Sequence, residues 1–172
     1  MRHFPLMVAA IFLCICVPVV IAQTAPAQLC VANMQFHGAP DSNSFGRDAL
    51  LKFLAKEKDR AIVQSVAIDA SDPEQALQSA KAKNCDYLVT TDQTEGHQQN
   101  SVMTGTFGNT SLPTYYVTTV YKLTKVSSGS EVMGGNFKAA DQSSEQNAVG
   151  FAMHKVADKV TEAIKKAGPV SK

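Results

Sequence analysis

Short apolar runs alternate along the first half of the chain with stretches in which apolar residues recur every three or four positions. The runs predict strands and the recurrences predict helices. In chain order these are a strand at 29–36, a helix from 42–44 to about 58, a strand at 61–68, a helix from 72 to about 83 and a strand at 85–91. Such alternation favours parallel strands joined by helical crossovers.

The second half of the chain has a different pattern. Residues 96–113 are rich in Gly, Ser, Thr and Asn, and we expect either a long, mobile loop or an extended hairpin. The strand-like segments 114–124 and 131–140 flank a Ser/Gly turn and predict an antiparallel pair. A last helix, capped by Ser143, runs to Gly168-Pro169.

Together these elements predict one mixed α/β (α+β) domain. It has a five-stranded mixed sheet with helices packed on it, in the order strand, helix, strand, helix, three strands, helix. We place this domain at 29–168, after a disordered lead-in at 23–28 and before a tail at 169–172.

The first 22 residues have the build of a secretory signal. Arg2 and His3 precede an apolar run from Leu6 to Ala22, and a small residue stands at the expected cleavage point after Ala22. We therefore expect a secreted or periplasmic protein with no membrane span after cleavage.

Two other interpretations of this segment are an uncleaved membrane anchor and a lipoprotein signal. An uncleaved anchor needs about 20 apolar residues, and this run is shorter and contains Pro18. A lipoprotein needs an attachment cysteine after a small residue, whereas Cys14 follows Leu13 and Cys16 follows Ile15.

Loss of Arg2 with the signal leaves 15 basic and 15 acidic side chains. Nucleic-acid binding needs a basic stripe, and the sequence has none. We therefore expect no nucleic-acid partner, and attraction to anionic lipid is equally unsupported.

Cys30 and Cys85 remain after cleavage. Export permits a disulfide between them, which would close a loop of about 55 residues and stabilise the fold by about 4 kcal/mol in the chain-entropy model. The alternative is a pair of buried free thiols.

Three short stretches resemble a known group of bacterial envelope domains. Val31–Phe36 resembles the V-A-V-x-x-F opening of the TolB amino-terminal domain, the CsgG-like family and the LpoB-type activators. Asp86–Val89 resembles their D-Y-L-V strand, and Leu123-Thr124 with Ser127–Gly129 resembles the L-x-D-x-x-T-G turn of their late hairpin. The resemblance covers residues 29–167.

The resemblance implies a mixed sheet in which the first and third strands are parallel neighbours. It thereby implies that Cys30 and Cys85 lie close enough for a disulfide. It also implies work in the envelope through contacts with other proteins. The chain lacks a lipid-attachment cysteine of the usual form, a propeller and paired amphipathic insertions, so anchoring, propeller functions and pore formation are not implied.

The sequence contains no recognisable catalytic or metal-binding motif. It has no Gly-x-Ser-x-Gly elbow, phosphate-binding loop, Cys-x-x-Cys pair or metal-ligand spacing of histidines, so we expect no catalytic residues, metal or cofactor. His37, Asp92 and Glu95 follow predicted strands at one end of the sheet, where α/β folds often place ligands. A small-ligand binder or hydrolase using these three is the alternative function.

The leading hypothesis is a non-catalytic interaction module that binds another envelope protein or a second copy of itself, and a stand-alone structural domain is a third. The 96–113 segment and the nearby hairpin would make the contact. Its candidate contact residues are His97, Asn100, Met103, Phe107, Asn109, Leu112 and Tyr115.

Overall fold

The computed structural model describes residues 25–36, 44–56, 62–105 and 108–167. Its strands are β1 (Ala27–Ala32), β2 (Gln35–Phe36), β3 (Val63–Ile68), β4 (Tyr87–Gly105), β5 (Gly108–Lys125) and β6 (Ser130–Asp141). Its helices are α1 (Ser44–Leu54), α3 (Pro73–Ala82) and α4 (Glu145–Ala167).

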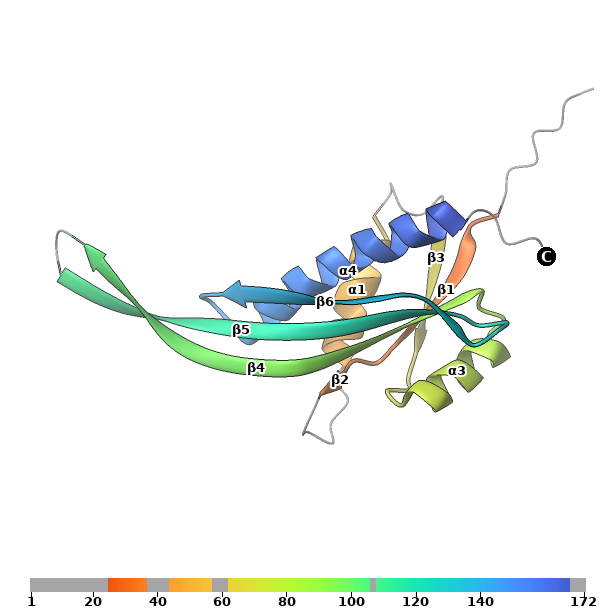
Figure 1. Cartoon of the computed structure of the whole chain (residues 1–172), viewed down its shortest axis with the longest axis horizontal. Helices are drawn as coiled ribbons and strands as arrows, with labels where there is room; N and C mark the ends of the chain where they lie inside the picture. The colour runs from red at the N-terminus through yellow and green to blue at the C-terminus, as the bar shows by residue number, and fades with distance from the viewer. Residues whose placement is uncertain (1–24, 37–43, 57–61, 106–107, 168–172) are drawn as a thin grey trace, which may run out of the picture.

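The strands form one mixed sheet in the order β3-β1-β4-β5-β6, and the short β2 also pairs with β4 (Figure 1). β1 runs parallel to both β3 and β4, while β4, β5 and β6 are antiparallel to one another. The predicted fold class is confirmed, and so is the expected pairing of the first and third predicted strands.

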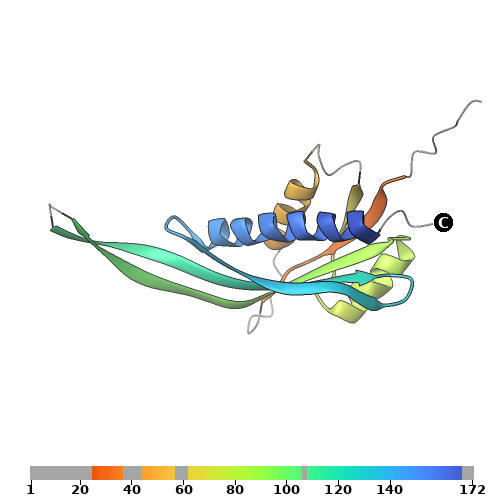
Figure 2. The same ribbon diagram turned by 45° about the horizontal axis from the view of Figure 1, so that its top comes forward.

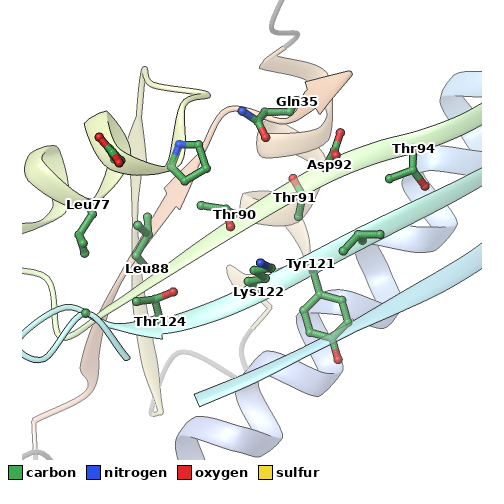
Figure 3. A pocket seen from close by; sticks show the side chains of 14 residues that line it. Gln35, Leu77, Leu88, Thr90, Thr91, Asp92, Thr94, Tyr121, Lys122 and Thr124 are labelled. Atoms are coloured by element: carbon green, nitrogen blue, oxygen red, sulfur yellow. The ribbon is translucent and has the colours of Figure 1, made fainter. Parts of the chain in front are cut away.

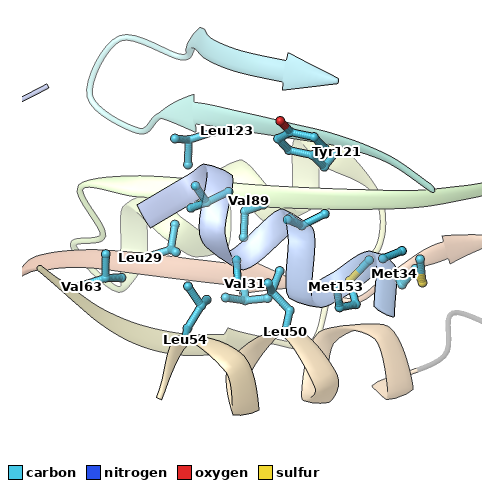
Figure 4. Close-up of a cluster of buried hydrophobic side chains, with 14 of the residues drawn as sticks. Leu29, Val31, Met34, Leu50, Leu54, Val63, Val89, Tyr121, Leu123 and Met153 are labelled. Carbon is cyan, nitrogen blue, oxygen red and sulfur yellow. The ribbon is translucent and has the colours of Figure 1, made fainter. Parts of the chain in front are cut away.

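Helices cover both faces of the sheet unequally. α1 and α4 lie on one face, and α3 lies on the other, near one end (Figures 1 and 2). The main core lies under α1 and α4 (Figure 4). Its fully buried side chains include Leu29, Val31, Met34, Leu50, Leu54, Leu123, Met153 and Val156.

A smaller core under α3 contains the two cysteines. Cys30 and Cys85 are 0% and 5% exposed and form a disulfide, with their Cα atoms 5.8 Å apart. Cys30 lies in β1 and Cys85 precedes β4, the strand that pairs with β1. The disulfide prediction is therefore confirmed and the free-thiol alternative is wrong.

The first predicted strand is divided in two. β1 begins at Ala27, two residues before the expected start, and ends at Ala32, and β2 follows at Gln35. Between them Met34 is fully buried and lies against Gly46 of α1, where an added Cβ would come within 2.9 Å of the Met34 Cβ atom. The break in the strand places Met34 in this tight contact, which the apolar run alone did not indicate.

The cap of the last helix lies one residue later than expected. Ser144, not Ser143, accepts a hydrogen bond from the backbone N–H of Asn147 at its Oγ, 3.1 Å away. The Asp141 carboxylate accepts bonds from the backbone N–H groups of Ser143 and Ser144. Ser143 lies in this turn, before the helix begins, so Ser144 is the residue that caps the helix.

The other predicted ends differ by a few residues. α1 stops at Leu54 rather than near residue 58, and β3 starts at Val63 rather than 61. α3 matches its prediction closely, since Asp72 caps it by accepting from the N–H groups of Glu74 and Gln75.

Candidate interaction arm

The stretch expected to be a loop or hairpin is an extended hairpin. β4 and β5 pair without interruption from Tyr87 opposite Lys125 to Gly105 opposite Gly108, apart from one irregularity between Gln93 and Glu95. The loop interpretation is therefore wrong, and the two strands reach well beyond their predicted ends at 91 and 114.

The far half of this hairpin projects away from the rest of the molecule (Figures 1 and 2). We call residues 97–105 and 108–116, from the pair His97–Tyr116 outward, the arm. The third strand of this region, β6, ends at Asp141 opposite Tyr115, so only the base of the arm has a neighbour on the β5 side.

The arm side chains that the structure describes are mostly exposed or half-buried, with Thr114 buried. His97 and Asn100 are exposed, Leu112 and Tyr115 are half-buried, and Val102 is 64% exposed. Of the other candidate contact residues, Met103 and Asn109 lie on the arm strands, and Phe107 lies outside the described residues. Continuous backbone pairing between β4 and β5 holds the arm together.

The arm carries no formal charge. No Asp, Glu, Lys or Arg occurs between Glu95 and Lys122, in a chain whose residues are 18% charged. Protein surfaces that face only water carry both signs of charge, whereas the cores of protein interfaces are depleted of charge. This is the strongest indication in the chain of a surface made for contact.

Two polar contacts lie at the base of the arm, one between β4 and β5 and one from β4 to α4. Glu95 accepts a hydrogen bond from the Thr118 hydroxyl at 2.8 Å, on the strand opposite. The Gln93 amide donates to Glu145, the first residue of α4. A Cβ at Gly96 would lie 2.5 Å from the Gln93 Nε2 atom, so glycine leaves room for this contact.

Aromatic stacking adds to this base. The His97 and Tyr116 rings are 5.2 Å apart and inclined by 17°, and the two residues face one another across β4 and β5. Sequence reasoning placed His97 in the contact region but did not find the Gln93–Glu145 contact, which joins residues far apart in the chain.

One edge of β4 lacks a strand neighbour along the arm. On the side away from β5, β1 pairs with Tyr87–Val89, and β2 pairs with Asp92 and Gln93. Beyond Gln93, no strand in the described parts of the chain pairs with that side of β4. We call this side of residues 96–105 the arm edge.

Two of the three residues of the alternative ligand site, Asp92 and Glu95, lie among the described residues. Asp92 lines a hollow of about 490 Å³ on the α3 side of the sheet (Figure 3), while Glu95 lies beyond the strand irregularity and contacts Thr118. His37 lies outside the described residues. Within the part of the chain described, no three His, Cys, Asp or Glu side chains gather as a metal site.

The hollow is lined by threonine, apolar and charged side chains, the charged ones being those of Glu74, Asp92 and Lys122. Thr90, Thr124, Leu77 and Leu88 surround it, whereas the ring of Tyr121 points to the opposite side of the sheet (Figure 3). The hydrolase or ligand-binder hypothesis stays a prediction.

Comparison with known proteins shows the fold. No family model and no curated protein matches the sequence. Among solved structures, PelC from Paraburkholderia phytofirmans, a dodecamer, is 19% identical with a TM-score of 0.54, over 79% of this chain and 88% of PelC.

Two further structures are similar. The hypothetical protein CT253 from Chlamydia trachomatis is 8% identical with a TM-score of 0.54, over 81% of this chain and 98% of CT253. The lipoprotein GNA1162 from Neisseria meningitidis is 13% identical with a TM-score of 0.50, over 80% of this chain and 99% of GNA1162. At these identities the likeness establishes a shared fold, and membership of the TolB, CsgG or LpoB groups stays a prediction.

None of the helices in the described residues has the length and apolar character needed to cross a bilayer.

Proposed function

We propose that this protein is a non-catalytic interaction module of the bacterial envelope and that the arm is its contact surface. The observation that carries the proposal is the uncharged arm, which projects from a body whose core lies elsewhere. A two-stranded ribbon is at best marginally stable by itself in water. Contact with a partner would supply further burial.

Several features support the envelope as its location. The first 22 residues read as an export signal, and the buried Cys30–Cys85 disulfide suits an oxidising compartment. The fold is shared with a neisserial lipoprotein. The partner is another envelope protein or a second copy of this chain, and the dodecamer formed by PelC shows that this fold is compatible with self-assembly.

Six of the proposed contact residues lie on the two arm strands, namely His97, Asn100, Met103, Asn109, Leu112 and Tyr115. The seventh is Phe107, which lies outside the described residues.

The test is a protein with a shortened arm. Gln98 and Tyr115 are paired residues, so Asn-Gly can join them as a two-residue hairpin turn in place of residues 99–114. Affinity capture from envelope extracts of the native organism, followed by mass spectrometry, compares this variant with the full chain. The full chain should retain a specific partner, itself included, and the shortened protein should lose it while keeping a cooperative unfolding transition.

A matched control alters a different exposed surface. Phe151 of α4 is 55% exposed and lies away from the arm, so Phe151→Ala should retain capture. If the shortened protein captures the same partner as the full chain, the arm is not the contact surface and the proposal fails.

A further inference from the structure

The arm edge is unprotected, unlike the two outer edges of the sheet. Exposed edge strands present free backbone N–H and C=O groups, and natural proteins guard them with charges, proline, bulges or short length. β6 carries Glu131 and Lys138 and pairs with β5 through a register shift. β3 has only six residues, and the Lys83 ammonium donates to its Ala67 carbonyl at 2.9 Å.

None of these devices occurs along the arm edge. Residues 96–105 contain no charged residue and no proline, and the pairing with β5 is regular from Glu95 to Gly105. The other side of the arm differs, because β5 carries Pro113, which has no N–H to donate to a neighbouring strand. The β4 side is therefore the one suited to accept another strand.

The chemistry of the edge favours a second copy of the same chain. In a two-fold antiparallel pairing, the residue on the axis lies opposite its own copy and the residues beside it lie diagonally from theirs, so a charged residue there would meet a like charge. The arm edge has none. Gln98, Gln99 and Asn100 each donate and accept hydrogen bonds, so they can bond to one another across the axis.

We propose that two copies of this protein pair antiparallel along their arm edges and join the two arms into one four-stranded sheet. This inference rests on the proposed function, because it names the partner of the same arm. At about 3.4 Å per residue the paired edge would be on the order of 30 Å long. The backbone ladder would give affinity, and the Gln and Asn side chains would set the register.

The experiment uses the full chain and variants at one exposed arm-edge residue. Analytical ultracentrifugation should show a reversible dimer for the native protein. Asn100→Lys and Asn100→Glu should each raise the dimer dissociation constant about tenfold or more, because like charges meet across the axis. Mixing the two variants should restore a dimer that contains one of each, as native mass spectrometry would show.

Ser111→Lys is the matched control. Ser111 is exposed on β5, opposite Val102, so the variant adds the same charge to the other strand of the arm. It should leave the dissociation constant unchanged, and thermal unfolding should confirm that all variants fold.

The outcomes separate this inference from the proposed function. A native protein that stays monomeric up to its solubility limit overturns the inference, as does a dimer that only Ser111→Lys weakens or a mixture with no preference for the Lys–Glu pair. If the protein is monomeric and the full chain still captures a different protein through its arm, only the self-pairing fails. If capture survives arm shortening, the proposed function fails.

Discussion

At the scale of single residues, a buried hydroxyl is left unsatisfied in the main core. Thr119 is fully buried on the α4 side of β5, opposite Gln93, and among the described residues its Oγ1 has no hydrogen-bond partner. A buried polar group without a hydrogen bond lowers stability.

Thr119→Val should therefore raise the free energy of unfolding by about 1 kcal/mol, because valine has the same shape without the hydroxyl. Urea unfolding measures the change. Thr118→Val is the control on the other face of the strand. It should bring no gain, since it removes the 2.8 Å bond from the Thr118 hydroxyl to Glu95. A loss of stability in Thr119→Val would show that the hydroxyl is satisfied after all.

Ionisation of the Asp141 carboxyl makes the free energy of unfolding depend on pH. Hydrogen bonds from the backbone N–H groups of Ser143 and Ser144 lower the pKa of the Asp141 carboxyl from its ordinary value. A carboxyl whose pKa is lower in the folded state stabilises the fold at pH values above its unfolded pKa. This stabilisation is lost as the pH falls through the folded pKa.

The stability difference between the native protein and Asp141→Asn should therefore shrink as the pH falls below about 4. Urea unfolding between pH 3 and 7 measures it. A difference that stays constant across this range would mean that the Asp141 charge contributes nothing to the start of α4.

At the scale of elements, the disulfide joins the start of the β1–β4 pair to the turn after α3. It closes a loop with a sequence separation of 55. Reduction of Cys30–Cys85 should lower the free energy of unfolding by about 4 kcal/mol.

Urea unfolding with and without a thiol reductant measures this effect. The Cys30→Ala/Cys85→Ala protein should not respond to the reductant and serves as the control. An unchanged midpoint in native protein, with both thiols shown free by mass spectrometry, would contradict the expectation.

The elements differ in how far the sequence could predict them. The parallel half was predictable, because β1 and the start of β4 are buried on both faces and read as apolar runs. Its crossover helices carry clear apolar spacings and the Asp72 cap. For the arm the sequence left a loop and an extended hairpin as alternatives, because Gln98-Gln99-Asn100 has neither apolar alternation nor high strand propensity. Backbone pairing between neighbouring strands holds the arm strands instead.

At the scale of the whole molecule, the chain divides into a body and an arm. The body holds both cores and the disulfide, while the arm extends beyond it (Figure 2). Regions with few buried apolar contacts open at low free-energy cost. We therefore expect the arm to open more readily than the body in the free protein.

The sequence singled out the proposed contact region but not its geometry. Residues 96–113 stood out by composition, and the structure puts that segment at the end of a projecting hairpin. The exposed arm edge could not be foreseen, because it depends on where β2 stops pairing with β4.

Hydrogen exchange, read peptide by peptide, tests the central claim most directly. It would compare dilute free protein with the same chain in its captured assembly. The account predicts that amides of the arm, above all residues 96–105, gain protection in the assembly while those of β1 and α4 do not change. Equal exchange of the arm in both samples, or new protection confined to the body, would contradict it.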